Sequence, residues 1–180
     1  MKVRMYNSYF FYDIINIGDN MRKIIIPAII ITCIIAYFVF DIKIYNVTGH
    51  SMNKTLFENE KVVTTKIKFK EISRGDIIAF EYENSIMIKR VIGLPNDVIS
   101  ILEDGTVMVN GNILEEDYLE FKVGESEIEY PYTVPEDSLF VLGDNRSDSM
   151  DSRIIKFGTV KESQIKGQVS FVLWKPHTIK

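Results

Sequence analysis

An uncharged apolar run near the N-terminus restricts the organisation of this chain more than any other feature of its sequence. Residues 24–40 read IIIPAIIITCIIAYFVF, and as a helix they would rise about 25 Å, slightly less than the roughly 30 Å hydrocarbon core of a bilayer. Apolar residues up to about position 45 could lengthen that helix. The run predicts a transmembrane anchor between an N-terminal tail, residues 1–23, and a domain at residues 41–180.

Basic residues flank this run unevenly. Arg22 and Lys23 lie directly before it, whereas only Lys43 follows closely behind it. The positive-inside rule therefore predicts a single-pass protein of the cell membrane, with a cytoplasmic tail and an extracytoplasmic domain. A cleaved signal peptide is the alternative, but the end of the run, AYFVFDIK, lacks the small-x-small pattern of a cleavage site.

The sequence after the run has the pattern of a β domain. Stretches such as DIIAFEY, IMIKRVIGL and SLFVLGD are rich in β-branched and aromatic residues, and helical periodicity is absent. Asp104-Gly105 and Asn110-Gly111 are dipeptides typical of tight hairpin turns. We therefore predict a mainly β protein, with a small hairpin excursion at about residues 103–135 and an N-terminal transmembrane helix.

Composition excludes several classes of function. The net charge of −4 and the lack of clustered basic residues argue against a nucleic-acid partner. His50 and His177 are the only histidines, and the acidic residues are not spaced like a metal-binding loop. No metal or cofactor is therefore predicted.

A hydrolase with few histidines needs another general base. His50 adjoins Ser51, but neighbouring side chains of an extended strand point to opposite faces, and His177 lies close to the C-terminus. A Ser-His-Asp triad is therefore not expected. Lys89 could serve instead if burial lowered its pKa from about 10.4 to roughly 7 or 8. Both faces of IMIKRVIGL are mainly apolar, which indicates burial, although a lysine that reaches solvent or forms a structural ion pair is the alternative.

Four blocks of this sequence resemble those of the type I signal peptidases. They are GHSMNKTL at 49–56, RGDIIAF at 74–80, KRVIGLPND at 89–97 and GDNRSDSMDSR at 143–153, in the order and spacing of that family. The resemblance implies a signal-peptidase-like antiparallel β-sheet domain. It also implies a membrane-bound serine endopeptidase that removes signal peptides from secreted pre-proteins and cuts after small-x-small sites.

The resemblance also implies roles for individual residues of a Ser-Lys dyad. Ser51 would be the nucleophile that forms an acyl-enzyme, Lys89 the general base, and the Ser51 N–H one oxyanion donor. Gly49 stands where some relatives have a serine that supplies the second donor, so that donor stays open.

The last block would support the dyad. Ser149 matches a serine that hydrogen-bonds the lysine, and Asp151 and Arg153 match a pair that braces the site. Asp144 and Arg146 of the same block would have supporting roles, which include holding a charged loop together.

A substrate would add as an extended strand beside two segments of backbone. The substrate-binding residues implied are Tyr45, Asn46, Val47, Thr48, Gly49, Ser85, Ile86, Met87 and Ile88. The expected partners are the signal peptides of pre-proteins, membrane lipid and the secretion translocase.

Two departures from the family pattern have structural meaning. Lys54 replaces the usual proline of the first block, which removes a restraint on φ just after the nucleophile. Asn96 replaces a usual glycine, a mild change because asparagine tolerates positive φ better than other non-glycine residues.

Two alternative functions use the same kind of fold. A non-catalytic assembly factor would have lost the catalytic pair, but Ser51 and Lys89 are both present. A self-cleaving regulator would carry a DNA-binding segment where this chain has its apolar run. The histidine-using branch of the family is disfavoured because this chain has Lys89.

Overall fold

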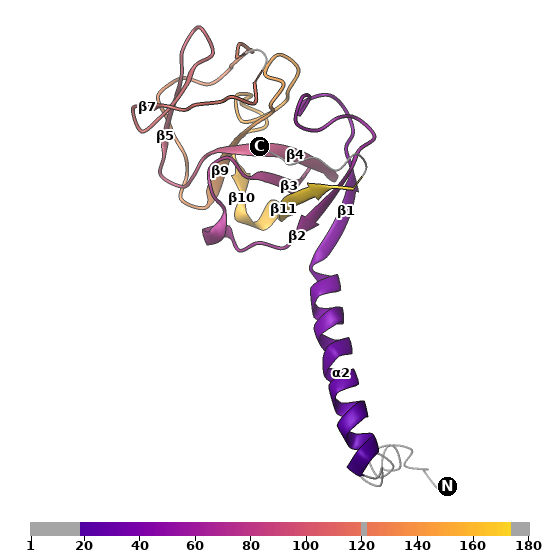
Figure 1. The fold of residues 1–180 in the computed structure, drawn as a ribbon. Helices are drawn as coiled ribbons and strands as arrows, with labels where there is room; N and C mark the ends of the chain where they lie inside the picture. Colours follow the sequence, from indigo (N-terminus) through magenta and orange to yellow (C-terminus); the bar gives the residue numbers. More distant parts are fainter. Residues whose placement is uncertain (1–18, 120–121, 174–180) are drawn as a thin grey trace, which may run out of the picture. The chain divides into compact units, whose positions relative to one another are not determined.

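The structure, a computed structural model, describes residues 19–119 and 122–173, although not the side chains of 19–20 and 34–40 (Figure 1). Most of the predicted tail at 1–23, and His177, lie outside these residues. The chain divides into two compact units, with the boundary between Asp41 and Ile42.

The first unit contains helix α2 (Asp19–Phe40). This helix begins five residues before the uncharged run, so Pro27 lies inside it and removes one backbone N–H from its hydrogen-bond ladder. Thr32 Oγ1 donates a hydrogen bond of 2.8 Å to the carbonyl of Ala28. Where the structure describes side chains, it contains no helix that is both long enough and apolar enough to cross a membrane.

The second unit is built on a seven-stranded sheet in which all neighbouring strands are antiparallel. In sheet order the strands are β1 (Ile42–Asn46), β2 (Lys61–Thr65), β11 (Ile165–Val172), β3 (Ile77–Tyr82), β4 (Ser85–Gly93), β9 (Ser138–Leu142) and β10 (Val160–Lys161). Two short 3-10 helices, Phe69–Glu71 and Glu162–Gln164, connect strands. The prediction of a mainly β, antiparallel domain is confirmed.

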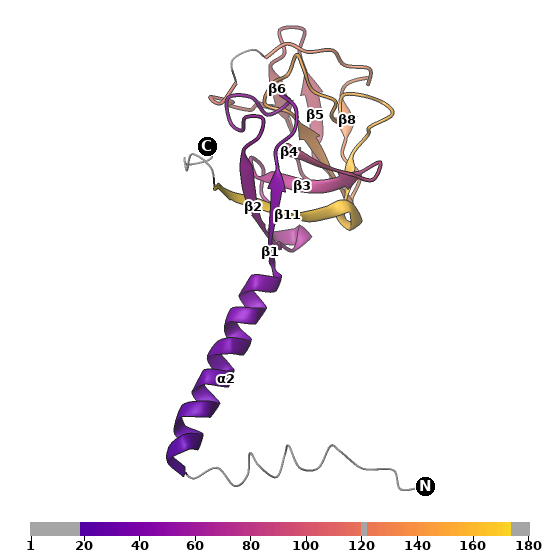
Figure 2. The same cartoon turned by 90° about the vertical axis from the view of Figure 1, so that its right-hand side faces the viewer.

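A four-stranded sheet forms the excursion from this main sheet. Its order is β7 (Asn112–Ile113), β6 (Val107–Val109), β5 (Val98–Ile101) and β8 (Tyr132–Thr133). The excursion therefore begins with β5 at Val98, before the predicted residue 103. Figures 1 and 2 show this smaller sheet to one side of the larger sheet.

Both predicted turns lie in this smaller sheet, and both central residues have positive φ only in the second turn, at Asn110 and Gly111. Gly105 lies between β5 and β6 with φ 80°, and Asn110 and Gly111 lie between β6 and β7 with φ 53° and 80°. Asn96, just before β5, has φ 68°, a left-handed conformation that glycine adopts without strain and that asparagine tolerates.

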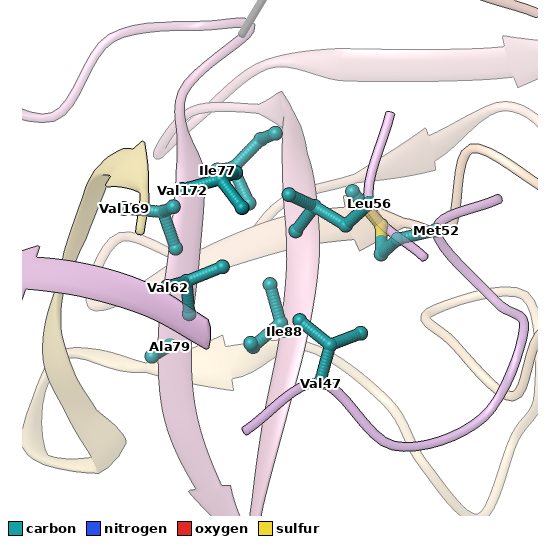
Figure 3. Packing of buried hydrophobic residues seen from close by; sticks show 9 residues of the cluster. All are labelled: Val47, Met52, Leu56, Val62, Ile77, Ala79, Ile88, Val169 and Val172. Atoms are coloured by element: carbon teal, nitrogen blue, oxygen red, sulfur yellow. The ribbon is translucent and has the colours of Figure 1, made fainter. Parts of the chain in front are cut away.

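Within the described part of the chain, buried apolar side chains form three clusters. The cluster that underlies the candidate site is shown in Figure 3, and it consists of Val47, Met52, Leu56, Val62, Ile77, Ala79, Ile88, Val169 and Val172. Met52 and Leu56 come from the loop between β1 and β2 and are 2% and 0% exposed. Their burial fixes this loop against the sheet.

Candidate active site

The loop between β1 and β2 holds Ser51 at the surface of the core. The N–H of Asn53 donates to the His50 carbonyl at 3.0 Å, and the N–H of Leu56 donates to the Met52 carbonyl at 2.8 Å. Ser51 is therefore part of a hydrogen-bonded turn whose apolar residues are buried. His50 is exposed, and its Nε2 lies 4.0 Å from a carboxylate oxygen of Glu58.

Lys54, in the same turn, has φ 75°. Proline is confined to φ near −65°, so the family's proline could not adopt this backbone conformation. The turn that contains Lys54 therefore excludes proline at this position.

Lys89 lies on β4, between β3 and β9, and its Nζ is 2.5 Å from Ser51 Oγ. The lysine is only 2% exposed, because the strand is covered on both faces. The structure therefore brings together the two residues that the resemblance selected, and Lys89 does not reach solvent.

Burial lowers the pKa of Lys89 from 10.5 to about 8, although Asp151 and Asp144 oppose the shift by favouring the ammonium. Arg153 acts in the same direction as burial, and Asp148 acts against it. A large fraction of this amine is therefore neutral at mildly alkaline pH, and a neutral amine can accept a hydroxyl proton.

Asp144 connects the lysine strand to the serine turn. Its carboxylate accepts hydrogen bonds from Arg90 Nε at 2.9 Å and Nη2 at 2.6 Å, and both side chains are buried. The hydroxyl of Thr55, in the Ser51 turn, donates to the same carboxylate. The register of β4 against β9 pairs Arg90 with Leu142, which places Asp144 within reach.

The loop that follows β9 also holds the backbone of the serine turn. The N–H of Asn145 donates to the Ser51 carbonyl at 2.9 Å, and its side-chain amide donates to the His50 carbonyl at 3.2 Å. A Cβ at Gly143 would collide with the Ser51 carbonyl oxygen, so glycine permits this close approach. No role was predicted for Asn145, and only its position in the GDNR run could have indicated one.

Asp151 and Arg153 form a buried pair, with Arg153 Nε 2.8 Å from Asp151 Oδ1. Asp151 also accepts the N–H of Gly143 at 3.0 Å, so the pair shapes the loop beside the dyad. Ser149 differs from the implied arrangement. Its Oγ is buried and has no hydrogen-bond partner among the described residues, Lys89 included.

A cavity of about 300 Å³ opens beside the Ser51 and Lys89 side chains. Its lining contains every predicted substrate-binding residue except Tyr45, which packs against the core cluster instead. The remaining lining residues are Ser51, Met52, Tyr82, Glu83, Lys89 and Met150. Among the described residues, no group of three or more His, Cys, Asp or Glu side chains could hold a metal ion.

Comparisons with known proteins agree on one family. The family model described as "Signal peptidase, peptidase S26" matches residues 19–174. Signal peptidase I of Bacillus amyloliquefaciens is 34% identical over 171 residues, which cover 89% of this chain and 90% of the relative. Signal peptidase IB of Staphylococcus aureus is 32% identical over 170 residues, which cover 83% and 87%. A solved signal peptidase I from Enterococcus faecalis is 36% identical, with 56% of this chain and 97% of that chain covered and a TM-score of 0.49.

Proposed function

This chain belongs to the S26 family of signal peptidases, serine endopeptidases that remove signal peptides, and we propose that Ser51 and Lys89 carry out this cleavage. The observation that carries the proposal is the 2.5 Å separation of Lys89 Nζ and Ser51 Oγ. The burial of the lysine supports a neutral amine, which a Ser-Lys mechanism requires.

In the acylation step, the neutral amine of Lys89 takes the proton of the Ser51 hydroxyl as Oγ attacks the scissile carbonyl. The Ser51 N–H donates a hydrogen bond to none of the described residues, so it can donate to the oxyanion and stabilise it. The tetrahedral intermediate collapses, and the Lys89 ammonium gives its proton to the leaving amine. The product is an ester between Ser51 and the signal peptide.

In the deacylation step, Lys89 is again neutral and removes a proton from a water molecule that attacks the ester carbonyl. Collapse of the second intermediate returns the proton to Ser51 Oγ and releases the signal peptide with a free carboxylate. Asp144, Asn145 and Asp151 would keep the two side chains at the distance that both proton transfers need.

The cavity beside the dyad would bind the residues before the scissile bond. Val47, Met52 and Ile88 line it with apolar surface, which suits uncharged side chains. We propose that the substrate lies extended along residues 46–49 and 85–88, with a small residue one and three positions before the cut.

We also propose that residues 24–40 anchor the chain in the membrane, on the basis of their uncharged sequence and the basic residues before them. Anchoring would confine Ser51 to the surface at which signal peptides emerge and raise its effective concentration there. Extraction of cell membranes at alkaline pH tests this: the chain should stay in the membrane pellet, and release into the soluble fraction would contradict anchoring.

Cleavage by single-residue variants tests the dyad. Full-length Ser51→Ala and Lys89→Ala, in detergent micelles, should leave a pre-protein with an Ala-x-Ala site uncut while their circular dichroism spectra stay unchanged. Ser73→Ala and Lys70→Ala replace exposed residues of the same types and should cleave like the wild type. Cleavage by either dyad variant at the wild-type rate would refute the mechanism.

A further inference from the structure

The segment between β7 and β8 places two side chains in the buried ion-pair network behind the dyad. Glu116 is 8% exposed, and its carboxylate accepts hydrogen bonds from Arg146 Nη2 at 2.5 Å and Nη1 at 3.2 Å. When only side-chain atoms are counted, Glu116 and Arg146 are each 1% exposed, so the ion pair is shielded from solvent. Glu116 belongs to none of the four sequence blocks.

Tyr118, two residues further on, covers the second arginine of the network. The guanidinium carbon of Arg90 lies 3.9 Å from the centre of the Tyr118 ring, which is the geometry of a cation–π contact. The Tyr118 hydroxyl donates a 2.5 Å hydrogen bond to Glu116 Oε1. Burial, together with the charge of Glu116, raises the pKa of Tyr118, so the phenol remains a donor.

The backbone of the same segment also contacts the loop at 143–153, at Gly124 and Glu127. A Cβ at Gly124 would collide with the Arg146 carbonyl and with the Arg153 guanidinium, and the N–H of Glu127 donates to the Arg153 carbonyl at 2.9 Å. Glu116, Gly124 and Glu127 therefore contact the two arginines of the loop at 143–153, Arg146 and Arg153.

Arg90, which Tyr118 covers, and Arg146, which Glu116 binds, both contact groups next to the dyad. Arg90 follows Lys89 on β4 and pairs with Asp144, which in turn accepts the Thr55 hydroxyl of the serine turn. Arg146 Nε donates to the Gly143 carbonyl at 2.9 Å, at the point where the loop approaches Ser51. If either guanidinium moved, Asp144 or Gly143 would be held less firmly, and the distance between Ser51 Oγ and Lys89 Nζ would be less well fixed.

We propose that Glu116 and Tyr118 are positioning residues for cleavage, which hold Arg90 and Arg146 and through them the geometry of the dyad. This inference rests on the proposed function. It assigns to the excursion a role in the reaction rate, beyond its contribution to the stability of the fold.

The alternative is a purely structural role, and the pH–rate profile separates the two. The charged groups facing Lys89 are Asp151, Asp144 and Asp148, which favour its ammonium, and Arg153, which disfavours it. If Arg90 drew away from Asp144, that carboxylate would be less well neutralised and would favour the ammonium more strongly. A merely structural role would lower the amount of folded enzyme and leave the profile of the folded fraction in place.

The decisive pair of variants is Tyr118→Leu and Tyr118→Phe in the full-length chain, assayed on an Ala-x-Ala pre-protein. Tyr118→Leu removes the ring over Arg90, and we expect kcat to fall about tenfold with KM little changed. The midpoint of its pH–rate profile should move up by about half a unit. Tyr118→Phe keeps the ring and should recover most of the rate.

A second pair keeps the test decisive if Tyr118→Leu does not fold. Glu116→Gln should lower kcat about tenfold because the Arg146 pair is broken, whereas Glu115→Gln makes the same change at the exposed neighbouring residue and should have no effect. Equal rates and profiles for Glu116→Gln and Glu115→Gln, or for Tyr118→Leu and the wild type, would overturn the positioning role. A wild-type chain that cuts no pre-protein would overturn the proposed function itself, and this inference with it.

Discussion

Lys89 Nζ lies 2.5 Å from Ser51 Oγ, although the two residues are 38 positions apart and belong to a central strand and to a surface turn. The lysine is fixed by its burial in β4, and the serine is fixed by Met52 and Leu56, which anchor its turn in the core. The contact therefore depends on how the turn packs on the sheet, and it would not form in either segment alone.

The first prediction concerns the pH dependence of cleavage. Because the folded-state pKa of Lys89 is about 8 and the neutral amine is the active form, kcat/KM should rise about tenfold per pH unit below roughly pH 7 and level off above roughly pH 9. Steady-state cleavage between pH 5 and pH 10 measures this. A rate that peaks near pH 5 would show that Lys89 is not the base.

The second prediction concerns stability. The pKa of Lys89 is about 8 in the folded chain and about 10.4 when unfolded, so between these values the unfolded chain binds more protons and stability rises with pH. Below pH 8 the folded protein holds a buried ammonium at a cost of about 3 kcal/mol. Lys89→Met should therefore be inactive but more stable than the wild type at pH 7, and the difference should shrink from pH 8 to pH 10.

Thermal unfolding of Lys89→Met at several pH values measures this difference. Lys70→Met, at an exposed position, is the matched control and should match the wild type throughout. A lower unfolding temperature for Lys89→Met at pH 7 would mean that the ion pairs of Lys89 outweigh its burial.

The third prediction concerns the pair that connects the two halves of the site. Asp144→Asn leaves the Arg90 guanidinium buried without its carboxylate, and it should lower the free energy of unfolding by about 3 to 5 kcal/mol. Asp148→Asn, on the same loop but exposed, should change it by less than about 0.5 kcal/mol. Urea unfolding of both variants gives the comparison, and equal losses would argue against the buried pair as the cause.

The fourth prediction reverses a consensus substitution. Lys54→Pro introduces the residue that is usual in the family, but the φ of 75° at this position is forbidden to proline. It should cost more than about 1 kcal/mol and slow cleavage relative to Lys54→Gly, because glycine can adopt this φ. A Lys54→Pro variant that is as stable and active as the wild type would show that the turn adopts another conformation.

The sequence alone determined the local features of this protein. Runs of β-branched and aromatic residues predicted a mainly β domain, and Asp104-Gly105 and Asn110-Gly111 predicted two turns that the structure contains. Asn96 was predicted to be a mild replacement of a family glycine because asparagine tolerates positive φ, and its φ is 68°. The choice of Ser51 and Lys89 came from the resemblance of four blocks, since neither residue is distinctive by itself.

Only the tertiary structure decided which distant side chains meet. It paired Glu116 with Arg146 across 30 positions and Asn145 with His50 across 95, and it left Tyr45 outside the cavity and Ser149 Oγ without a partner among the described residues. Turn and strand preferences depend on a residue and its immediate neighbours, so a sequence displays them directly. Long-range contacts depend on strand register and on the path of loops, which are set by the packing of the whole core.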